Sequence, residues 1–150
     1  MHETEQVADC AQRVRSSFAK QGLMATLGAT LESVSPGIVE IVLRPMPSIF
    51  QQHGFVHAGA VSAIADTAAG YAALTLMPAS AGVLTTEFKI NLLAPAKGDR
   101  ILAVGKVVKS GRTLTLAQTE VFAESDGHSK LIALLTATLM TIQGRVEVSD

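Results

Sequence analysis

The sequence contains a single cysteine, Cys10, among 150 residues. One cysteine excludes an internal disulfide and a cluster of cysteine ligands around a metal. Long hydrophobic runs are also absent: no run of about 18 apolar residues occurs, which excludes a transmembrane helix. The first ten residues, MHETEQVADC, carry three acids and lack the basic and then apolar pattern of a signal peptide. We therefore expect a cytoplasmic protein with no membrane partner.

Charge is scarce as well, since charged residues make up 17% of the chain and hydrophobic residues 48%. The formal net charge is −1 and the cations form no stripe, so we expect no binding to nucleic acid, which needs clustered phosphate contacts. Such an apolar composition indicates that a partner chain covers part of the surface. The length of 150 residues fits one domain, and we expect it to span 1–150.

The first third of the sequence predicts a helix and a hairpin. Apolar residues recur at helical spacing from Val7 to Phe18, which predicts a helix over about 4–20 that Gly22 ends. Two strand-like runs, MATLGATLESV and GIVEIVLRP, flank the turn residues 35–37 and predict a β-hairpin. Residues 45–56 contain prolines and a glycine and predict a loop.

A long helix and four strands are predicted to follow. Residues 58–77 have high helix propensity, and Pro78 ends this helix. Four strand-like runs come after it, over about 83–93, 99–109, 113–124 and 131–143. The separators APAKG, SGR and SDGHS are short and rich in turn residues, so we expect an antiparallel meander. A twisted antiparallel sheet wrapped around the long helix satisfies this order.

One carboxylate, Asp66, lies inside the long helix among small residues. The face that holds it reads Gly, Ser, Ala, Asp, Ala, Gly, Ala at 59, 62, 63, 66, 69, 70 and 73, which would allow another backbone to come close. No lysine or arginine stands three or four residues away to pair with the acid. A buried, unpaired carboxylate is unfavourable, and desolvation raises its pKa. Asp66 is either an acid that faces water or part of a functional site.

The start of the same helix offers backbone amides. His57 precedes the first turn, so the N–H groups of Ala58 and Gly59 are among those without intrahelical acceptors. They lie at the positive end of the helix dipole and suit a developing oxyanion. His57 and Asp66 are nine residues apart, or roughly 13 Å along a helix. That distance is too long for one carbonyl to meet both, so we expect two copies of the chain to share a site.

Two further segments leave alternatives open. The turn Lys109, Ser110, Gly111 and Arg112 is either a solvated hairpin end or a grip on a phosphorylated ligand tail, with Arg112 as a bidentate donor. The run TTEFKIN, which begins at Thr85, is either an ordinary strand or brings one hydroxyl to the site.

Other chemistries find little support in the sequence. His53 and His57 stand four residues apart, but a catalytic zinc usually has three protein ligands, and we predict no metal. The sequence holds no G-x-S-x-G elbow of a serine hydrolase. It also holds neither glycine-rich motif that binds nucleotide phosphates.

The run HGFVHAGAVSAIADTAAGYAA resembles the PaaI-type acyl-CoA thioesterases of the hotdog-fold superfamily (phenylacetic acid degradation, 4-hydroxybenzoyl-CoA thioesterase-like). Their motif is H-G-G, six residues, and then Asp at the helix centre. The resemblance continues with TTEFKINLLAPAKGD, GRT and the DG turn, and covers about 25–143. It implies an α+β hotdog fold, in which a curved antiparallel sheet of about six strands wraps a long central helix, with an N-terminal helix added. It also implies homodimers that pair into homotetramers.

The resemblance implies a role for each of five residues. Asp66 would act as the nucleophile or as the general base on water. His57 would lie close to the thioester, and the backbone amide of Ala58 would be the oxyanion donor. Gln51 would help to hold substrate or water, and Thr85 would supply the hydroxyl from the next strand. Gly59 and the turn at 109–112 are then the candidates for binding substrate.

The function that the resemblance implies is hydrolysis of a short-chain or aromatic acyl-CoA to a free acid and CoA. No cofactor is expected, because CoA is part of the substrate. The family's usual glycine is Ala58 here, whose methyl group could crowd the thioester. One alternative is a hotdog protein that binds acyl-CoA without catalysis. A hotdog enoyl-CoA hydratase ranks lower, since no histidine follows Asp66 before His128.

Overall fold

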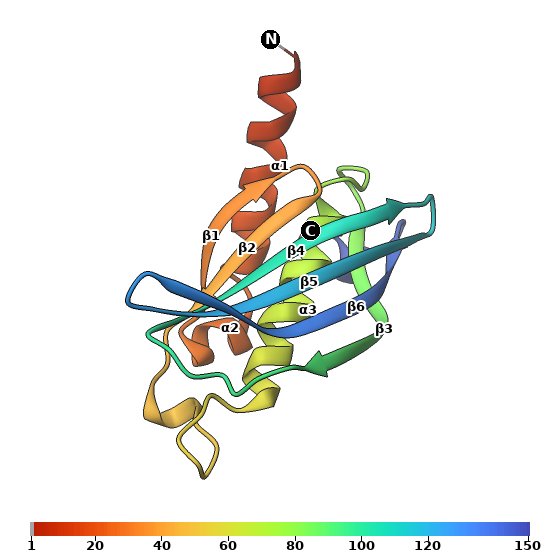
Figure 1. The fold of residues 1–150 in the computed structure, drawn as a ribbon. Coiled ribbons are helices and arrows are strands. Elements are labelled where there is room, and N and C mark those ends of the chain that lie inside the picture. The colour runs from red at the N-terminus through yellow and green to blue at the C-terminus, as the bar shows by residue number, and fades with distance from the viewer. Residues whose placement is uncertain (1) are drawn as a thin grey trace.

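The computed structural model describes residues 2–150, which run from an amino-terminal helix to a long last strand and a short carboxyl-terminal turn (Figure 1). The helices are α1 (His2–Phe18), α2 (Gly22–Leu27) and α3 (Ala58–Leu74), with 3-10 helices η1 (Pro47–Ile49) and η2 (Val146–Val148). The strands are β1 (Thr30–Ser35), β2 (Ile38–Leu43), β3 (Gly82–Leu92), β4 (Arg100–Ser110), β5 (Leu114–Ser125) and β6 (His128–Ile142). None of the helices within 2–150 is long and apolar enough to cross a membrane.

All six strands form one antiparallel sheet in the order β1-β2-β4-β5-β6-β3. The sheet curves around α3 (Figure 1), which confirms the predicted helix wrapped by about six strands. The predicted meander is correct for β4, β5 and β6 but wrong for β3, which pairs with β6 at an edge. The APAKG segment is not a hairpin turn, because its backbone bonds elsewhere: Ala96 O accepts the N–H of Val56 at 3.0 Å. It therefore connects an edge strand to an interior one.

The segment before β1 is a helix, where the sequence predicted a strand from residue 24 onward. Met24 and Leu27 lie three apart on one face of α2, and both are buried. Gly28 then ends the helix in the left-handed region at a φ of 69°, which suits glycine. Gly22, predicted to end the first helix, begins α2, and α1 ends earlier, at Phe18.

Small residues on α3 allow the sheet to come very close. Ala65, Ala68, Ala69 and Ala72 are completely buried. A Cβ added to Gly105 on β4 would lie 2.4 Å from the backbone carbonyl of Ala68, so only glycine fits there. The sheet of the same chain thus packs closely on this face of α3, next to the face that holds Asp66. This close wrapping holds α3, and whatever it carries, in one position.

A guanidinium from α1 holds the carboxyl-terminal end of α3. Arg13 Nη1 donates to Leu74 O at 3.4 Å and to Met77 O at 3.3 Å, and Nη2 donates to Ala81 O. Its Nε donates to Asp150 O at 3.0 Å. Arg13 therefore donates to the last carbonyl of the helix and to two carbonyls after it, at the negative end of the helix dipole.

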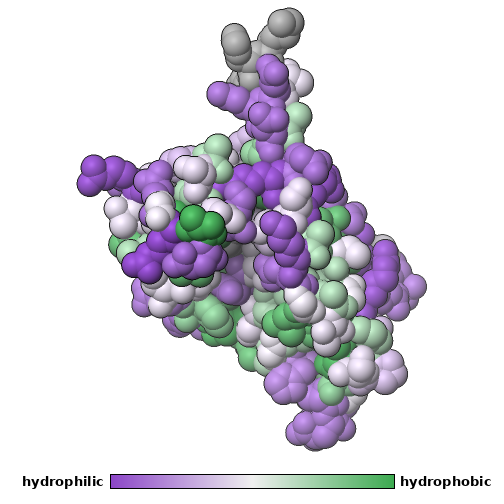
Figure 2. Space-filling view, turned by 180° about the vertical axis from the view of Figure 1, so that it is seen from behind, coloured by the Kyte–Doolittle hydropathy of each residue, from purple (hydrophilic) through white to green (hydrophobic). Residues whose placement is uncertain are grey.

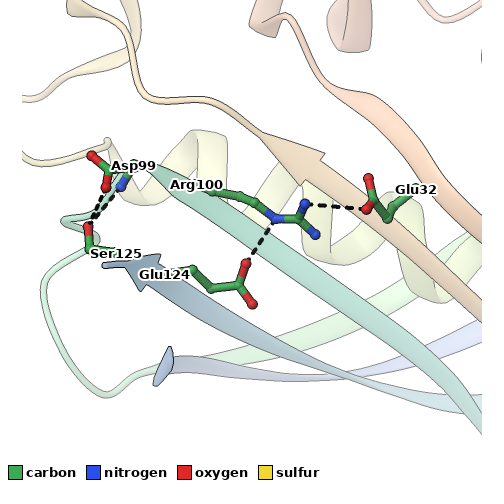
Figure 3. A network of polar contacts seen from close by, with 5 residues as sticks. All are labelled: Glu32, Asp99, Arg100, Glu124 and Ser125. Carbon is green, nitrogen blue, oxygen red and sulfur yellow. Dashed lines mark hydrogen bonds and ion pairs between the residues drawn. The ribbon is translucent and has the colours of Figure 1, made fainter. Parts of the chain in front are cut away.

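At the start of β4, an ion-pair network joins three strands (Figure 3). Arg100 pairs with Glu124 of β5 at 2.9 Å and with Glu32 of β1 at 3.3 Å. The hydroxyl of Ser125 meets Asp99 Oδ2 at 3.1 Å beside it. Because these groups are partly exposed to solvent, the network contributes modestly to stability and chiefly aligns the strand ends.

Strand β3 forms an edge of the sheet and carries exposed apolar side chains. Leu84, Phe88 and Leu92 are 50%, 46% and 55% exposed. On the face seen from behind, apolar residues form several patches between polar ones (Figure 2). A long, apolar edge strand is typical of a surface that pairs with another chain.

Candidate active site

The first turn of α3 is held by His57. Its backbone is extended, with φ −59° and ψ 138°, and its Nδ1 accepts the N–H of Gly59 at 2.7 Å. The carbonyl of His57 accepts the amides of Ala60 and Val61. Among the described residues, no group accepts the N–H of Ala58. The histidine thus caps the helix and leaves one amide free at the positive end of its dipole.

The free amide borders a hollow of about 520 Å³, here called the amide hollow. Its walls come from the loop before α3, from α3 itself, from the end of β3 with the segment after it, and from β6. They are formed by Gln51, Phe55, Val56, His57, Ala58, Val61, Leu92, Leu93, Ala94, Pro95, Ala96 and Ile132. The structure therefore brings together three predicted residues: Gln51, His57 and Ala58. Gln51 Oε1 accepts the amides of His53 and Phe55, so its side chain also holds the loop in place.

Asp66 lies two turns further along α3 and is half-buried. Thr85 Oγ1 donates to its Oδ1 at 2.8 Å. Burial raises the pKa of Asp66 above its usual range, and the hydrogen bond from Thr85 lowers that pKa in part. None of the ion pairs within 2–150 involves this carboxylate. Of the two alternatives left open for Thr85, the structure shows its hydroxyl beside the acid.

The acid borders a second hollow of about 330 Å³, here called the acid hollow. It lies between α3, the start of β3 and the link between α1 and α2. Its walls are formed by Gln21, Asp66, Thr67, Gly70, Tyr71, Val83, Leu84 and Thr85. No residue lines both hollows. Since α3 is unbroken from Ala58 to Leu74, Ala58 and Asp66 lie about 12 Å apart along it.

The remaining predicted residues lie apart from both hollows or are already bonded. The amide of Gly59 is taken by His57. The turn Lys109, Ser110, Gly111 and Arg112 is exposed and lines neither hollow.

The turn at 109–112 nevertheless lies at the same end of the sheet as the acid. Ser110 is opposite Thr115, Thr115 is opposite Leu139, and Leu139 is opposite Thr85. One row across the sheet therefore links the turn to Thr85, over about 14 Å at the usual strand spacing.

Two parts of the hollows were not predicted from the sequence. Gln21 stands between two helices where the sequence predicted only a helix end, and no pattern distinguishes it. The segment 92–96, LLAPA, is the other part; its sequence predicted a strand end followed by a turn. Its signal was the proline, which fits a crossing segment better than a hairpin. No three His, Cys, Asp or Glu side chains within the described part of the chain converge to hold a metal.

This geometry defines a curved sheet around one helix with an acid and a free amide on it, and comparison with known proteins identifies the class. The family model described as "Thioesterase superfamily" matches residues 53–130. The chain belongs to the thioesterase superfamily. It is a thioester hydrolase with the hotdog fold, and both predictions are confirmed.

Individual relatives agree with this assignment. The solved structure of a thioesterase family protein from Silicibacter pomeroyi is 51% identical and has a TM-score of 0.87, over 89% of this chain and 98% of that chain. The E. coli PaaI protein from the phenylacetic acid degradation operon has the same fold, with a TM-score of 0.82 at 19% identity, over 92% of this chain and 96% of that chain. A curated Halobacterium salinarum relative named "Putative esterase VNG_1336C" is 33% identical over 79% of this chain and 81% of its own length.

Proposed function

We propose that this protein hydrolyses acyl-CoA thioesters to a free acid and CoA, at sites that two chains build together. One observation carries the proposal: β3 connects the two hollows. Thr85, bonded to Asp66, lies at the start of the strand, and Leu92, at its end, lines the amide hollow. Antiparallel pairing of two β3 edges would place the start of one strand beside the end of the other. The acid of one chain would then meet the amide of its partner, twice per dimer.

The chemistry follows from these two groups. The thioester carbonyl oxygen would accept the N–H of Ala58, which stabilises the negative charge that develops on that oxygen. Asp66 of the other chain would take a proton from water as the oxygen of that water adds to the carbonyl carbon. The carbon–sulfur bond then breaks, and the leaving thiolate takes the proton to give CoA. Alternatively, the carboxylate attacks the carbon directly and water cleaves the resulting anhydride.

The surroundings of Asp66 suit either role. A half-buried carboxylate with no cation paired to it is a stronger base than a fully exposed one, consistent with its raised pKa. Thr85 holds one oxygen, which leaves the other for water or substrate. His57 would orient the helix start beside the thioester, and Gln51 would hold substrate or water at the mouth of the amide hollow.

The rest of the proposed assembly follows the same lines. Lys109 and Arg112 would grip phosphates of CoA, and Ser110 and Gly111 would add donors from the same exposed turn. Gly59 would contribute by fixing His57. Exposed apolar residues near that turn, Val108 and Leu114 among them, support a further pairing of dimers into a homotetramer. We propose that the protein works in the cytoplasm and that the reaction needs no cofactor.

Asp66→Asn tests the function directly. This change keeps the acceptor for Thr85 but removes the base, so kcat for short or aromatic acyl-CoAs falls by about 10²-fold or more, measured by release of thiol. Asp9→Asn, on the exposed side of α1, is the control and retains full turnover. Hydrolysis by Asp66→Asn at the normal rate would overturn the role of the acid. Tight acyl-CoA binding by the unchanged protein without any thiol release would favour the non-catalytic alternative.

A further inference from the structure

A chain of hydrogen bonds leads away from the acid hollow. Ser17 Oγ donates to Asp150 Oδ1 at 2.5 Å. The oxygen of Ser17 therefore accepts from the hydroxyl of Tyr71, at 3.0 Å, and Tyr71 in turn accepts from Gln21 Nε2 at 2.9 Å. Each hydroxyl in this chain has one donor and one acceptor. The order of these hydrogen bonds thus fixes which atom of the Gln21 side-chain amide faces Tyr71, namely Nε2.

The two residues nearest to the hollow are held firmly. The side chain of Tyr71 is 4% exposed, and its ring packs on Phe18 with centroids 6.2 Å apart. Gln21 is half-buried, and no described residue donates to its Oε1. Both residues line the acid hollow and also a smaller adjoining hollow of about 240 Å³. Val83 lines both hollows as well. Gln21 and Tyr71 are therefore the polar part of the wall between the two spaces.

The wall lies further along α3 than the acid. Asp66 and Tyr71 are five residues apart on α3, or about 8 Å along its axis. Gly70 lies between them, where a Cβ would have only Leu139 Cδ2 within 4 Å, at 3.7 Å. The space along the helix between the acid and the wall is therefore open.

We propose that Gln21 is a specificity-determining residue, and that the preferred acyl groups are about seven atoms long and end in a hydroxyl. This inference rests on the proposed function, because the acyl group must start at Asp66. A terminal hydroxyl donates to Gln21 Oε1, which is otherwise unpaired among the described residues. A terminal methyl group would cover that oxygen without bonding it, which is unfavourable. The link between α1 and α2 thereby selects the substrate.

A matched pair of substrates tests the inference. 6-Hydroxyhexanoyl-CoA and heptanoyl-CoA have acyl groups with equal numbers of heavy atoms and differ only in the last one. In the unchanged protein, kcat/KM is about fivefold higher for the hydroxyacyl thioester, as expected for one neutral hydrogen bond. In Gln21→Leu the ratio falls to about one. Gln12→Leu, the same exchange on the exposed face of α1, keeps the ratio.

A second variant covers the case in which Gln21→Leu does not fold. Tyr71→Phe removes the acceptor of Gln21 Nε2 and leaves the ring in place. The amide of Gln21 is then no longer held in position, so the ratio of the two kcat/KM values falls although Gln21 itself is unchanged. An unchanged ratio in either folded variant would overturn the inference. An equal or lower kcat/KM for the hydroxyacyl thioester in the unchanged protein would also overturn the inference. Turnover of heptanoyl-CoA in that experiment would still support the proposed function.

Binding separates the inference from the proposed function. If these two thioesters and the short and aromatic acyl-CoAs all go unhydrolysed, the proposed function fails. The corresponding non-hydrolysable thioethers of CoA are then compared by calorimetry. If the hydroxyalkyl thioether binds about fivefold more tightly and this preference is lost in Gln21→Leu, the result supports Gln21 as the specificity-determining residue. Equal affinities overturn it.

Discussion

At the residue scale, the hydroxyl of Thr85 tunes the pKa of Asp66. Burial raises the pKa of this acid, and the hydrogen bond from Thr85 lowers it in part. Thr85→Val removes the lowering contribution, so the pKa of Asp66 rises further. Because the proposed base or nucleophile is the carboxylate form, we expect the acidic limb of kcat/KM against pH to move to higher pH. The measurement is a pH–rate profile under kcat/KM conditions.

The neighbouring threonine provides the control for that profile. Thr86 Oγ1 donates to Thr138 O at 3.1 Å and does not touch the acid. Thr86→Val therefore leaves the acidic limb where it is. Identical limbs for Thr85→Val and the unchanged protein would show that the hydroxyl does not act on Asp66.

The backbone N–H of Ala58 can be deleted without a change in the fold. Proline is favoured at the first position of a helix, and His57 already has the extended backbone that a residue before proline prefers. Ala58→Pro removes the proposed oxyanion donor and lowers kcat by about 10²-fold. Ala58→Gly keeps the donor and restores the family's usual residue, so it retains activity. Circular dichroism verifies the fold, and full activity in Ala58→Pro would exclude this amide as the donor.

At the scale of elements, α3 depends on α1 for the termination of its last turn. Arg13→Met keeps the packing of the side-chain stem and removes the hydrogen bonds to carbonyls at and after the end of α3. The free energy of unfolding falls by about 2 kcal/mol, as expected for bonds from a charged donor, and urea denaturation measures it. Arg15 lies exposed on the same helix, so Arg15→Met changes stability little. Equal midpoints for both variants would contradict the capping role.

The helices and strands show how much of the structure can be predicted from local sequence patterns. The face of small residues that holds Asp66 predicted a close approach of another backbone, whereas the structure shows this approach on the next face of the helix, where Gly105 meets Ala68. The neighbour of β3 could not be predicted, because adjacency in a sheet depends on how the whole sheet closes around α3. The same limit explains why Gln21 was missed: its partners Tyr71 and Ser17 are distant in sequence. By contrast, the candidate acid and the helix start could be named from the sequence, since both lie on one helix, and their roles stay predictions.

At the scale of the whole molecule, the proposed two-chain site makes inactive variants complementary. A chain with Asp66→Asn retains the amide half of the site, and a chain with Ala58→Pro retains the acid half. If the two are unfolded together and refolded as an equal mixture, half of the dimers are mixed and each has one intact site. The mixture then recovers about a quarter of normal activity. Each variant refolded alone serves as the control, and no recovery in the mixture would place both halves within one chain.

The unbroken course of α3 also has a kinetic consequence. With acid and amide held about 12 Å apart on one rigid rod, no flexing of a single chain can bring them together. On dilution below the dissociation constant of the proposed dimer, turnover would then depend on the square of the protein concentration. The cell could thus set a threshold for thioester hydrolysis through the amount of protein alone, with no effector and no modification.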